Sequence, residues 1–208
     1  MDAAHSTTLL NVVATRVDDR SEGVTVRVAS VLFITVLTAA AAQISFPLPF
    51  TQIPFTFQPM VVLVGGLVLG SKLGFTSQVL YLMAGVAGLP VFAASATLPP
   101  GFLRLVGPSG GYLMAYPLAA LVVGSLAERG FAKRYASSVA AMLVGLAVIY
   151  ASGTLWLAYF ARLASSSAAV GLSTALATGV YPFVLADLAK LAAAAGITPG
   201  LWRLIGTR

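Results

Sequence analysis

The 208-residue sequence contains no cysteine, one histidine and few charged side chains. Without cysteine there can be no disulfide, no thiolate nucleophile and no Cys-ligated metal or iron–sulfur site. The single histidine, His5, lies in a polar N-terminal stretch, which argues against histidine-based catalysis and His-rich metal sites. Charged residues make up only 9% of the chain and hydrophobic residues 59%, whereas a soluble domain is about 25% charged. This composition predicts an integral membrane protein.

The hydrophobic residues form six runs, at about 26–45, 58–70, 74–92, 110–127, 137–160 and 178–196. A membrane-spanning helix needs about 20 apolar residues, so the second run is short. We therefore expect an all-α integral membrane fold, a bundle of six transmembrane helices over residues 24–197. Residues 1–23 lack the features of a signal peptide and are expected to form a retained N-terminal tail, with a C-terminal tail at 198–208.

A proline-dense segment, "SFPLPFTQIPFTFQP", precedes the second run. Proline removes a backbone donor and interrupts regular helices. The segment is therefore predicted to be a non-helical first loop at membrane depth. Such backbone is tolerated only where protein covers it or where it lines a cavity.

The distribution of lysine and arginine predicts the orientation. If the N-terminus is cytoplasmic, nine of these cations lie in inner segments and only Arg104 and Arg162 lie in outer loops; the nine are Arg16, Arg20, Arg27, Lys72, Arg129, Lys133, Arg134, Arg203 and Arg208. The positive-inside rule then places both termini in the cytoplasm. The excess of cations in the inner segments also explains the net charge of +6. The sequence has no basic run interleaved with aromatic residues, so nothing in it indicates nucleic-acid binding.

Two short motifs resemble enzyme signatures and do not meet their requirements. "GPSGG" at 107–111 fits the pattern of a nucleophile elbow, but that motif needs a strand–turn–helix setting and a histidine partner. "GGLVLGSKLG" resembles a phosphate-binding loop, but its serine and lysine are in the reverse order. Neither hydrolase nor ATPase activity is predicted.

Two charged residues, Asp187 and Lys190, stand in the middle of the last hydrophobic run, "TGVYPFVLADLAKLAAAAG". Each costs about 2.5–3.5 kcal/mol near the bilayer centre, so such residues normally face the bundle interior and serve a function. Their i, i+3 spacing places them on one face of a helix. The alternative is that the two charges neutralise each other and only stabilise the bundle.

Further polar and aromatic residues at membrane depth or in the proline-dense segment favour a binding site. Together they could form a pocket with an apolar body and a few oriented polar groups. A lysine suits one carboxylate, and an aspartate can accept N–H groups, so the predicted ligand is small, largely apolar and monoanionic. No metal or cofactor is expected. The candidate substrate-binding residues are Asp187, Lys190, Gln58, Thr56, Gln43, Tyr81, Phe92 and Tyr112.

Four segments carry a resemblance to a known family: "LPFTQIPFTFQPMVVLVGGLVLGSKLG", "YLMAGVAGLPVFA", "LVGPSGGYL" and "YPFVLADLAKL". In this order they resemble the BioY family, the biotin-binding S components of energy-coupling-factor (ECF) vitamin transporters. The resemblance covers about residues 29–196. It implies a six-helix bundle in the bacterial cytoplasmic membrane that binds biotin near its outer side. It also implies work with a transmembrane coupling subunit and two ATPase subunits.

By similarity to the family, Asp187 and Lys190 form a substrate-binding element, and the loop from Pro47 to Gln58 could act as a lid over the site. From charge alone, we assign the ligand carboxylate to Lys190. Arg104 could recruit the anion, but we interpret it as a solvated loop cation. One departure concerns the A-x-x-x-A pattern through which S components dock the coupling subunit. Its nearest equivalents here are Thr35-xxx-Ala39 and Thr38-xxx-Ala42.

Three alternatives to biotin uptake remain. The protein could be an S component for another small vitamin, an intramembrane enzyme, or a structural membrane subunit in which Asp187 and Lys190 form a packing bridge. The enzyme hypothesis suffers from the absence of a partner nucleophile, metal set or oxyanion donors.

Overall fold

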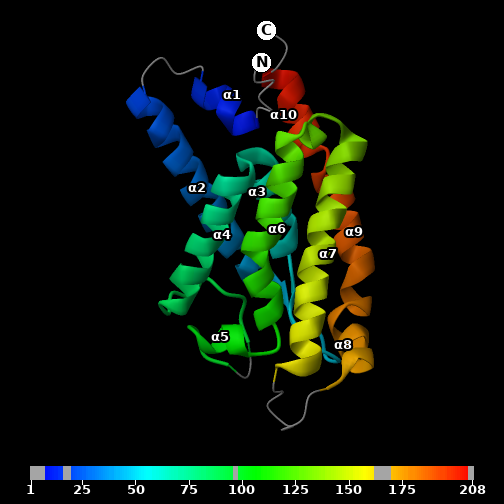
Figure 1. The fold of residues 1–208 in the computed structure, drawn as a ribbon. Helices are drawn as coiled ribbons and strands as arrows, with labels where there is room; N and C mark the ends of the chain where they lie inside the picture. The colour runs from blue at the N-terminus through cyan, green and yellow to red at the C-terminus, as the bar shows by residue number, and fades with distance from the viewer. Residues whose placement is uncertain (1–7, 16–19, 96–97, 162–169, 206–208) are drawn as a thin grey trace.

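A computed structural model describes residues 8–15, 20–95, 98–161 and 170–205. His5, Arg16, Arg162 and Arg208 lie outside these ranges. The described chain is a bundle of helices with one two-stranded hairpin (Figure 1). The elements are α1 Leu9–Thr15, α2 Arg20–Gln43, β1 Ser45–Phe46, β2 Phe55–Thr56, α3 Gln58–Leu69, α4 Ser71–Val86, α5 Leu103–Val106, α6 Gly110–Glu128, the 3-10 helix η1 Phe131–Lys133, α7 Tyr135–Tyr159, α8 Leu172–Gly179, α9 Tyr181–Ala194 and α10 Ile197–Ile205.

Four described segments are long and apolar enough to cross a membrane: Glu22–Gln43, Gly110–Glu128, Tyr135–Tyr159 and Tyr181–Leu204. The helices α3 and α4 are shorter, with 12 and 16 residues. The membrane character and the mostly helical fold predicted from the sequence are thus confirmed, while a count of six spans stays a prediction. The segments expected as tails also contain structure, namely α1, the start of α2 and α10.

The helices α6 and α7 pack against each other along the centre of the bundle, with α3 and α4 also against α6 (Figure 1). Small residues allow this close approach. A Cβ on Gly66 would come within 2.8 Å of the Ala120 carbonyl oxygen, and one on Gly145 within 2.4 Å of Leu63. On α2, Thr38 and Ala42 are fully buried, so this part of the alanine-rich run packs within the bundle.

A single residue, Gly70, separates α3 from α4. Its φ of 83° favours glycine, and a Cβ there would lie 2.8 Å from both Glu128 Oε1 and Thr8 Cγ2. The same Glu128 oxygen accepts hydrogen bonds from the Ser71 backbone N–H (2.8 Å) and the Ser71 hydroxyl (2.7 Å). A carboxylate from α6 therefore caps the N-terminus of α4, where backbone donors lack partners.

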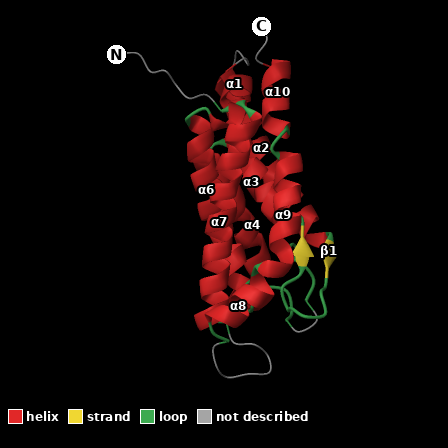
Figure 2. Cartoon of the chain, turned by 90° about the vertical axis from the view of Figure 1, so that its right-hand side faces the viewer, coloured by secondary structure: helices red, strands yellow, loops and turns green. Residues whose placement is uncertain are grey.

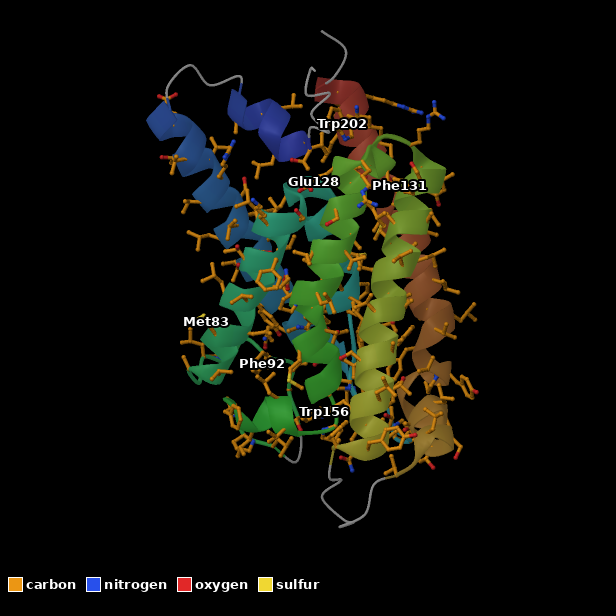
Figure 3. All side chains as sticks on the ribbon, in the orientation of Figure 1. Met83, Phe92, Glu128, Phe131, Trp156 and Trp202 are labelled. Carbon is orange, nitrogen blue, oxygen red and sulfur yellow. The ribbon has the colours of Figure 1, made fainter. Side chains whose placement is uncertain are left out.

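The two ends of the bundle differ. The helices α1 and α10 lie at one end, while α5, α8 and the hairpin lie toward the other (Figure 2). Side chains mark the same division, with Glu128 and Trp202 at the first end and Phe92 and Trp156 toward the second (Figure 3). We call these the terminal end and the hairpin end.

The proline-dense segment is non-helical up to Phe57, as predicted, but it also contains strand pairing that the sequence did not predict. Strands β1 and β2 are antiparallel, with Ser45 opposite Thr56 and Phe46 opposite Phe55. The hairpin carries Thr56 directly to the start of α3 at Gln58.

Candidate functional site

A cavity at the hairpin end is lined by the first loop, the start of α3, residues in and on either side of α5, and the helices α6, α7, α8 and α9. Its walls are largely apolar and aromatic, with Phe92, Tyr112, Tyr116 and Phe183 among them. A few polar side chains reach it from different elements. This is the usual composition of a small-molecule site.

Asp187 forms part of the cavity wall and is 8% exposed. Its helix, α9, starts at Tyr181, so at 1.5 Å per residue the aspartate lies about 9 Å along the helix axis. Phe183, one turn earlier, is also buried in the cavity wall. The predicted inward face of this helix is therefore confirmed.

Both carboxylate oxygens of Asp187 have partners. Lys190 Nζ donates to Oδ1 at 2.8 Å, and the Tyr150 hydroxyl of α7 donates to Oδ2 at 2.7 Å. Each carboxylate oxygen can accept more than one hydrogen bond. Asp187 is thus a fixed acceptor at the cavity wall that can still receive N–H groups of a ligand.

Lys190 lies on the other side of that carboxylate. Its ammonium donates to the backbone carbonyl of Thr56 at 2.7 Å and lies 3.5 Å from the centre of the Phe55 ring. Lys190 contributes to a separate small void, and Asp187 borders both that void and the main cavity. The two predicted charges form a direct ion pair, but only the aspartate is part of the main cavity wall.

Arg104 is placed differently from the prediction. It was interpreted as a solvated loop cation, but it is 8% exposed and forms part of the main cavity wall. Its Nε donates to the Pro99 carbonyl at 3.0 Å and its Nη1 to the Ala93 carbonyl at 2.9 Å. Nη2 has no hydrogen-bond partner among the described residues. Burial lowers the pKa of the guanidinium, yet an arginine keeps its charge in proteins.

Two buried side chains meet at the start of α3. Gln58 Nε2 donates to the Tyr81 hydroxyl at 2.5 Å, and that hydroxyl donates to the Val91 carbonyl at 3.3 Å. Gln58 forms part of the main cavity wall, whereas Tyr81 lies behind it with no exposed surface. Tyr81 of α4 therefore connects the start of α3 to the segment after α4.

Tyr112 of α6 stands in the cavity wall and donates its hydroxyl to the Gly179 carbonyl at 2.9 Å. Glycines make room for it. A Cβ on Gly153 would lie 2.3 Å from the Tyr112 ring, and one on Gly179 would lie 2.2 Å from its hydroxyl oxygen. The ring position is thus set by backbone of α7 and α8.

Five predicted site residues come together around the main cavity: Asp187, Gln58, Thr56, Phe92 and Tyr112. Lys190 and Tyr81 contact this group from behind. Gln43 is exposed and lies outside the main cavity, where its amide donates to the Pro90 carbonyl at 3.1 Å. Which of these residues contact a ligand stays a prediction.

Sequence reasoning missed Tyr150. It is one of several tyrosines in apolar runs, and nothing local distinguishes it from a lipid-facing residue. A pairing between α7 and α9 would have been needed to identify it. Within the described ranges, no group of three or more His, Cys, Asp or Glu residues could hold a metal ion.

Known proteins resemble this chain in both sequence and fold. The chain is 40% identical to the probable biotin transporter BioY of Pyrococcus horikoshii over 167 residues, covering 80% of this chain and 90% of the relative. It is also 40% identical to the biotin transporter BioY of Thermotoga maritima over 172 residues, covering 82% and 92%.

A solved structure has the same fold. The crystal structure of the S component for biotin from an ECF-type ABC transporter superposes with a TM-score of 0.76 at 22% identity, covering 90% of this chain and 95% of the other. The sequence matches the BioY family over residues 11–207. This protein therefore belongs to the BioY family.

Proposed function

We propose that this protein takes up biotin across the cytoplasmic membrane as the substrate-binding S component of an ECF-type transporter. Its named relatives are biotin transporters, and the solved protein that shares its fold is an S component for biotin. Transport would be driven by separate partners, a transmembrane coupling subunit and two ATPase subunits. The protein itself has the role of a binding subunit rather than an enzyme.

One observation carries the choice of ligand. The cavity wall combines an acceptor, the Asp187 carboxylate, with a cation, Arg104, in mostly apolar and aromatic surroundings. Biotin has a ureido ring with N–H donors, an apolar body and a carboxylate on an apolar chain. The ureido N–H groups suit Asp187, and the carboxylate suits the guanidinium.

The cavity wall changes which cation is assigned to the ligand carboxylate. Charge alone gave the ligand carboxylate to Lys190, but its ammonium is engaged by Asp187 and Thr56 and does not form part of the main cavity wall. Arg104 does form part of that wall, and its Nη2 has no hydrogen-bond partner among the described residues. We therefore assign the carboxylate to Arg104. Thr56, Gln58, Phe92 and Tyr112 complete the proposed site, with Tyr81, Lys190 and Gln43 in supporting positions.

The proposed topology has six passes, α2, α3, α4, α6, α7 and α9, with both termini in the cytoplasm. The short helix α3 is largely buried against its neighbours, whereas α4 packs on α6 and α2 and exposes Phe75, Leu80 and Met83, as a lipid-facing helix would. The terminal end is then cytoplasmic and the hairpin end faces outward. Biotin would reach the cavity from outside.

Equilibrium binding to biotin, desthiobiotin and biotin amide tests this function. The wild-type protein should bind biotin most tightly and prefer it over the amide. Asp187→Asn should weaken binding of both acid and amide. Removing a charge opposite a ligand group costs about 2–5 kcal/mol, or about thirty-fold to several thousand-fold in Kd.

Arg104→Gln should abolish the preference for acid over amide, and Arg104→Lys should keep part of it. Arg129→Gln is the matched control, because Arg129 is an exposed arginine at the terminal end. It should leave both affinities unchanged. Absence of biotin binding by the folded wild-type protein would refute the proposed function.

A further inference from the structure

We infer that Lys190 is a positioning residue that holds strand β2 against α9, and that it does not contact the carboxylate of the ligand. The inference rests on the proposed function for its ligand and concerns how the same site is closed. It also gives the Asp–Lys pair a role that neither a ligand-binding pair nor a simple packing bridge describes.

The ammonium group of Lys190 contacts both α9 and strand β2. A lysine has three N–H donors and no acceptor. Two are used by the Asp187 carboxylate and the Thr56 carbonyl, at 2.8 and 2.7 Å. The charge also lies over aromatic rings, 3.5 Å from the centre of Phe55 and 5.1 Å from that of Phe57. Cations are attracted to ring faces at such distances. Two of the three N–H donors of Lys190 are therefore used by the aspartate and the strand, and the charge lies against the rings that flank Thr56.

The Asp187–Lys190 pair lies between two cavities. Asp187 borders the main cavity and the small void, whereas Lys190 borders the void, beside Pro59 and Leu191, and is not part of the main cavity wall. The ammonium thus lies behind the carboxylate as seen from the ligand site. A ligand in the main cavity meets the acceptor and not the cation.

Thr56 links Lys190 to the main cavity. Its backbone carbonyl accepts from Lys190, while the residue itself forms part of the main cavity wall. The other described contacts that fasten β2 are weaker or apolar, such as the stacking of Phe55 on Phe183 with ring centres 6.5 Å apart. Lys190 is thus the charged connection between the hairpin and the helix bundle. Its loss should free the hairpin and shorten the residence of the ligand.

Hydrogen exchange of the ligand-free protein in lipid nanodiscs gives a test that needs no ligand. In Lys190→Met, peptides spanning residues 44–57 should exchange at least tenfold faster than in the wild type. Lys133→Met is the matched control, since Lys133 also lies over a ring, 5.2 Å from the centre of Trp202, at the terminal end. It should leave exchange of the hairpin unchanged. Equal exchange in Lys190→Met and wild type would overturn the inference.

Binding kinetics test the second half of the inference. Lys190→Met should raise the dissociation rate of biotin about tenfold or more, change the association rate little, and keep the preference for biotin over its amide. Phe55→Leu should act in the same direction through the other side of the contact. The double variant should be no worse than the more affected single variant, because both remove one connection. Phe75→Leu, at an exposed phenylalanine of α4, serves as control.

The outcomes separate this inference from the proposed function. If Lys190→Met loses the preference for acid over amide, Lys190 contacts the carboxylate and the inference is wrong. If additive effects of Lys190→Met and Phe55→Leu are found, the two do not act through one contact and the inference is also wrong. If no variant, including wild type, binds biotin, the proposed function fails, and hairpin exchange still decides whether Lys190 holds the strand.

Discussion

The Tyr150 hydroxyl of α7 and the Asp187 carboxylate of α9 are joined by a hydrogen bond of 2.7 Å at the wall of the main cavity. The bond connects two helices and fixes the direction in which the carboxylate can accept. Together with Lys190 on the other oxygen, it presents Asp187 in one orientation. A preorganised acceptor loses less freedom when a ligand binds.

Tyr150→Phe should therefore weaken biotin binding. A side chain that must be immobilised when a ligand binds costs about 0.5–1.5 kcal/mol, so Kd should rise about two- to tenfold. Because Arg104 is untouched, biotin and its amide should lose affinity by a similar factor. Isothermal titration of both ligands measures this. Tyr159→Phe, an exposed tyrosine on the same helix, should have no effect, and an unchanged Kd in Tyr150→Phe would exclude a role for the bond.

Gly153→Ala should reduce the cavity without touching any polar group. A methyl at this position would lie 2.3 Å from the Tyr112 ring, so the ring must move, and it already borders the cavity. Strain of this kind costs about 1–3 kcal/mol. We expect weaker binding of biotin and a smaller effect on the slimmer desthiobiotin, measured by competition. Gly200→Ala is the control, since a methyl there meets no neighbour within 4 Å. Equal losses for both ligands would argue against a steric cause.

Glu128→Ala should lower stability and leave biotin affinity unchanged. The variant removes both hydrogen bonds to Ser71 at the start of α4, and loss of a helix cap costs about 1–2 kcal/mol. For a chain of this size the Tm should fall by about 2–8 °C. Ser71→Ala should overlap with this effect, so the double variant should be less destabilised than the sum. Additive losses would show that the two residues stabilise the protein separately.

The proposed orientation is testable because the chain has no cysteine of its own. Lys133→Cys at the terminal end and Thr174→Cys in α8 place single exposed thiols on opposite ends. In intact cells, a membrane-impermeant thiol reagent should label only Thr174→Cys. Both variants should react after the membrane is permeabilised. Labelling of Lys133→Cys in intact cells would reverse the topology.

Much of the architecture follows from sequence because hydrophobic runs and prolines act locally. The limits of α6 and α7, the non-helical stretch before α3 and the inward face of α9 all follow from such patterns. The run at 26–45 missed the polar start of α2 at Arg20, and the run at 74–92 overshot the end of α4 at Val86. Hairpin pairing did not, since a two-residue strand has too short a period to recognise. Thr56, which pairs with Ser45, also accepts a hydrogen bond from Lys190 of α9, a contact between distant parts of the chain that no local pattern encodes.

The candidate site was only partly predictable for a similar reason. Asp187 and Gln58 stand out because polar groups in apolar runs are costly. Arg104 looked like an ordinary loop cation, because the sequence does not show that the loop folds back over the cavity. Lys190 was identified as special, but its partner Thr56 is 134 residues away. Only the three-dimensional arrangement distinguishes a charge that faces the ligand from one that faces a strand.

The one-residue connection at Gly70 makes the two short helices mechanically dependent on each other. α3 carries Gln58 at the hairpin end and α4 carries Tyr81, and the two side chains are hydrogen-bonded. Axial displacement of one helix must therefore be followed by the other or break this bond. Glu128 holds the start of α4 at the terminal end, so the pair of helices is fastened at both ends, and neither helix can slide along its axis without breaking one of these bonds.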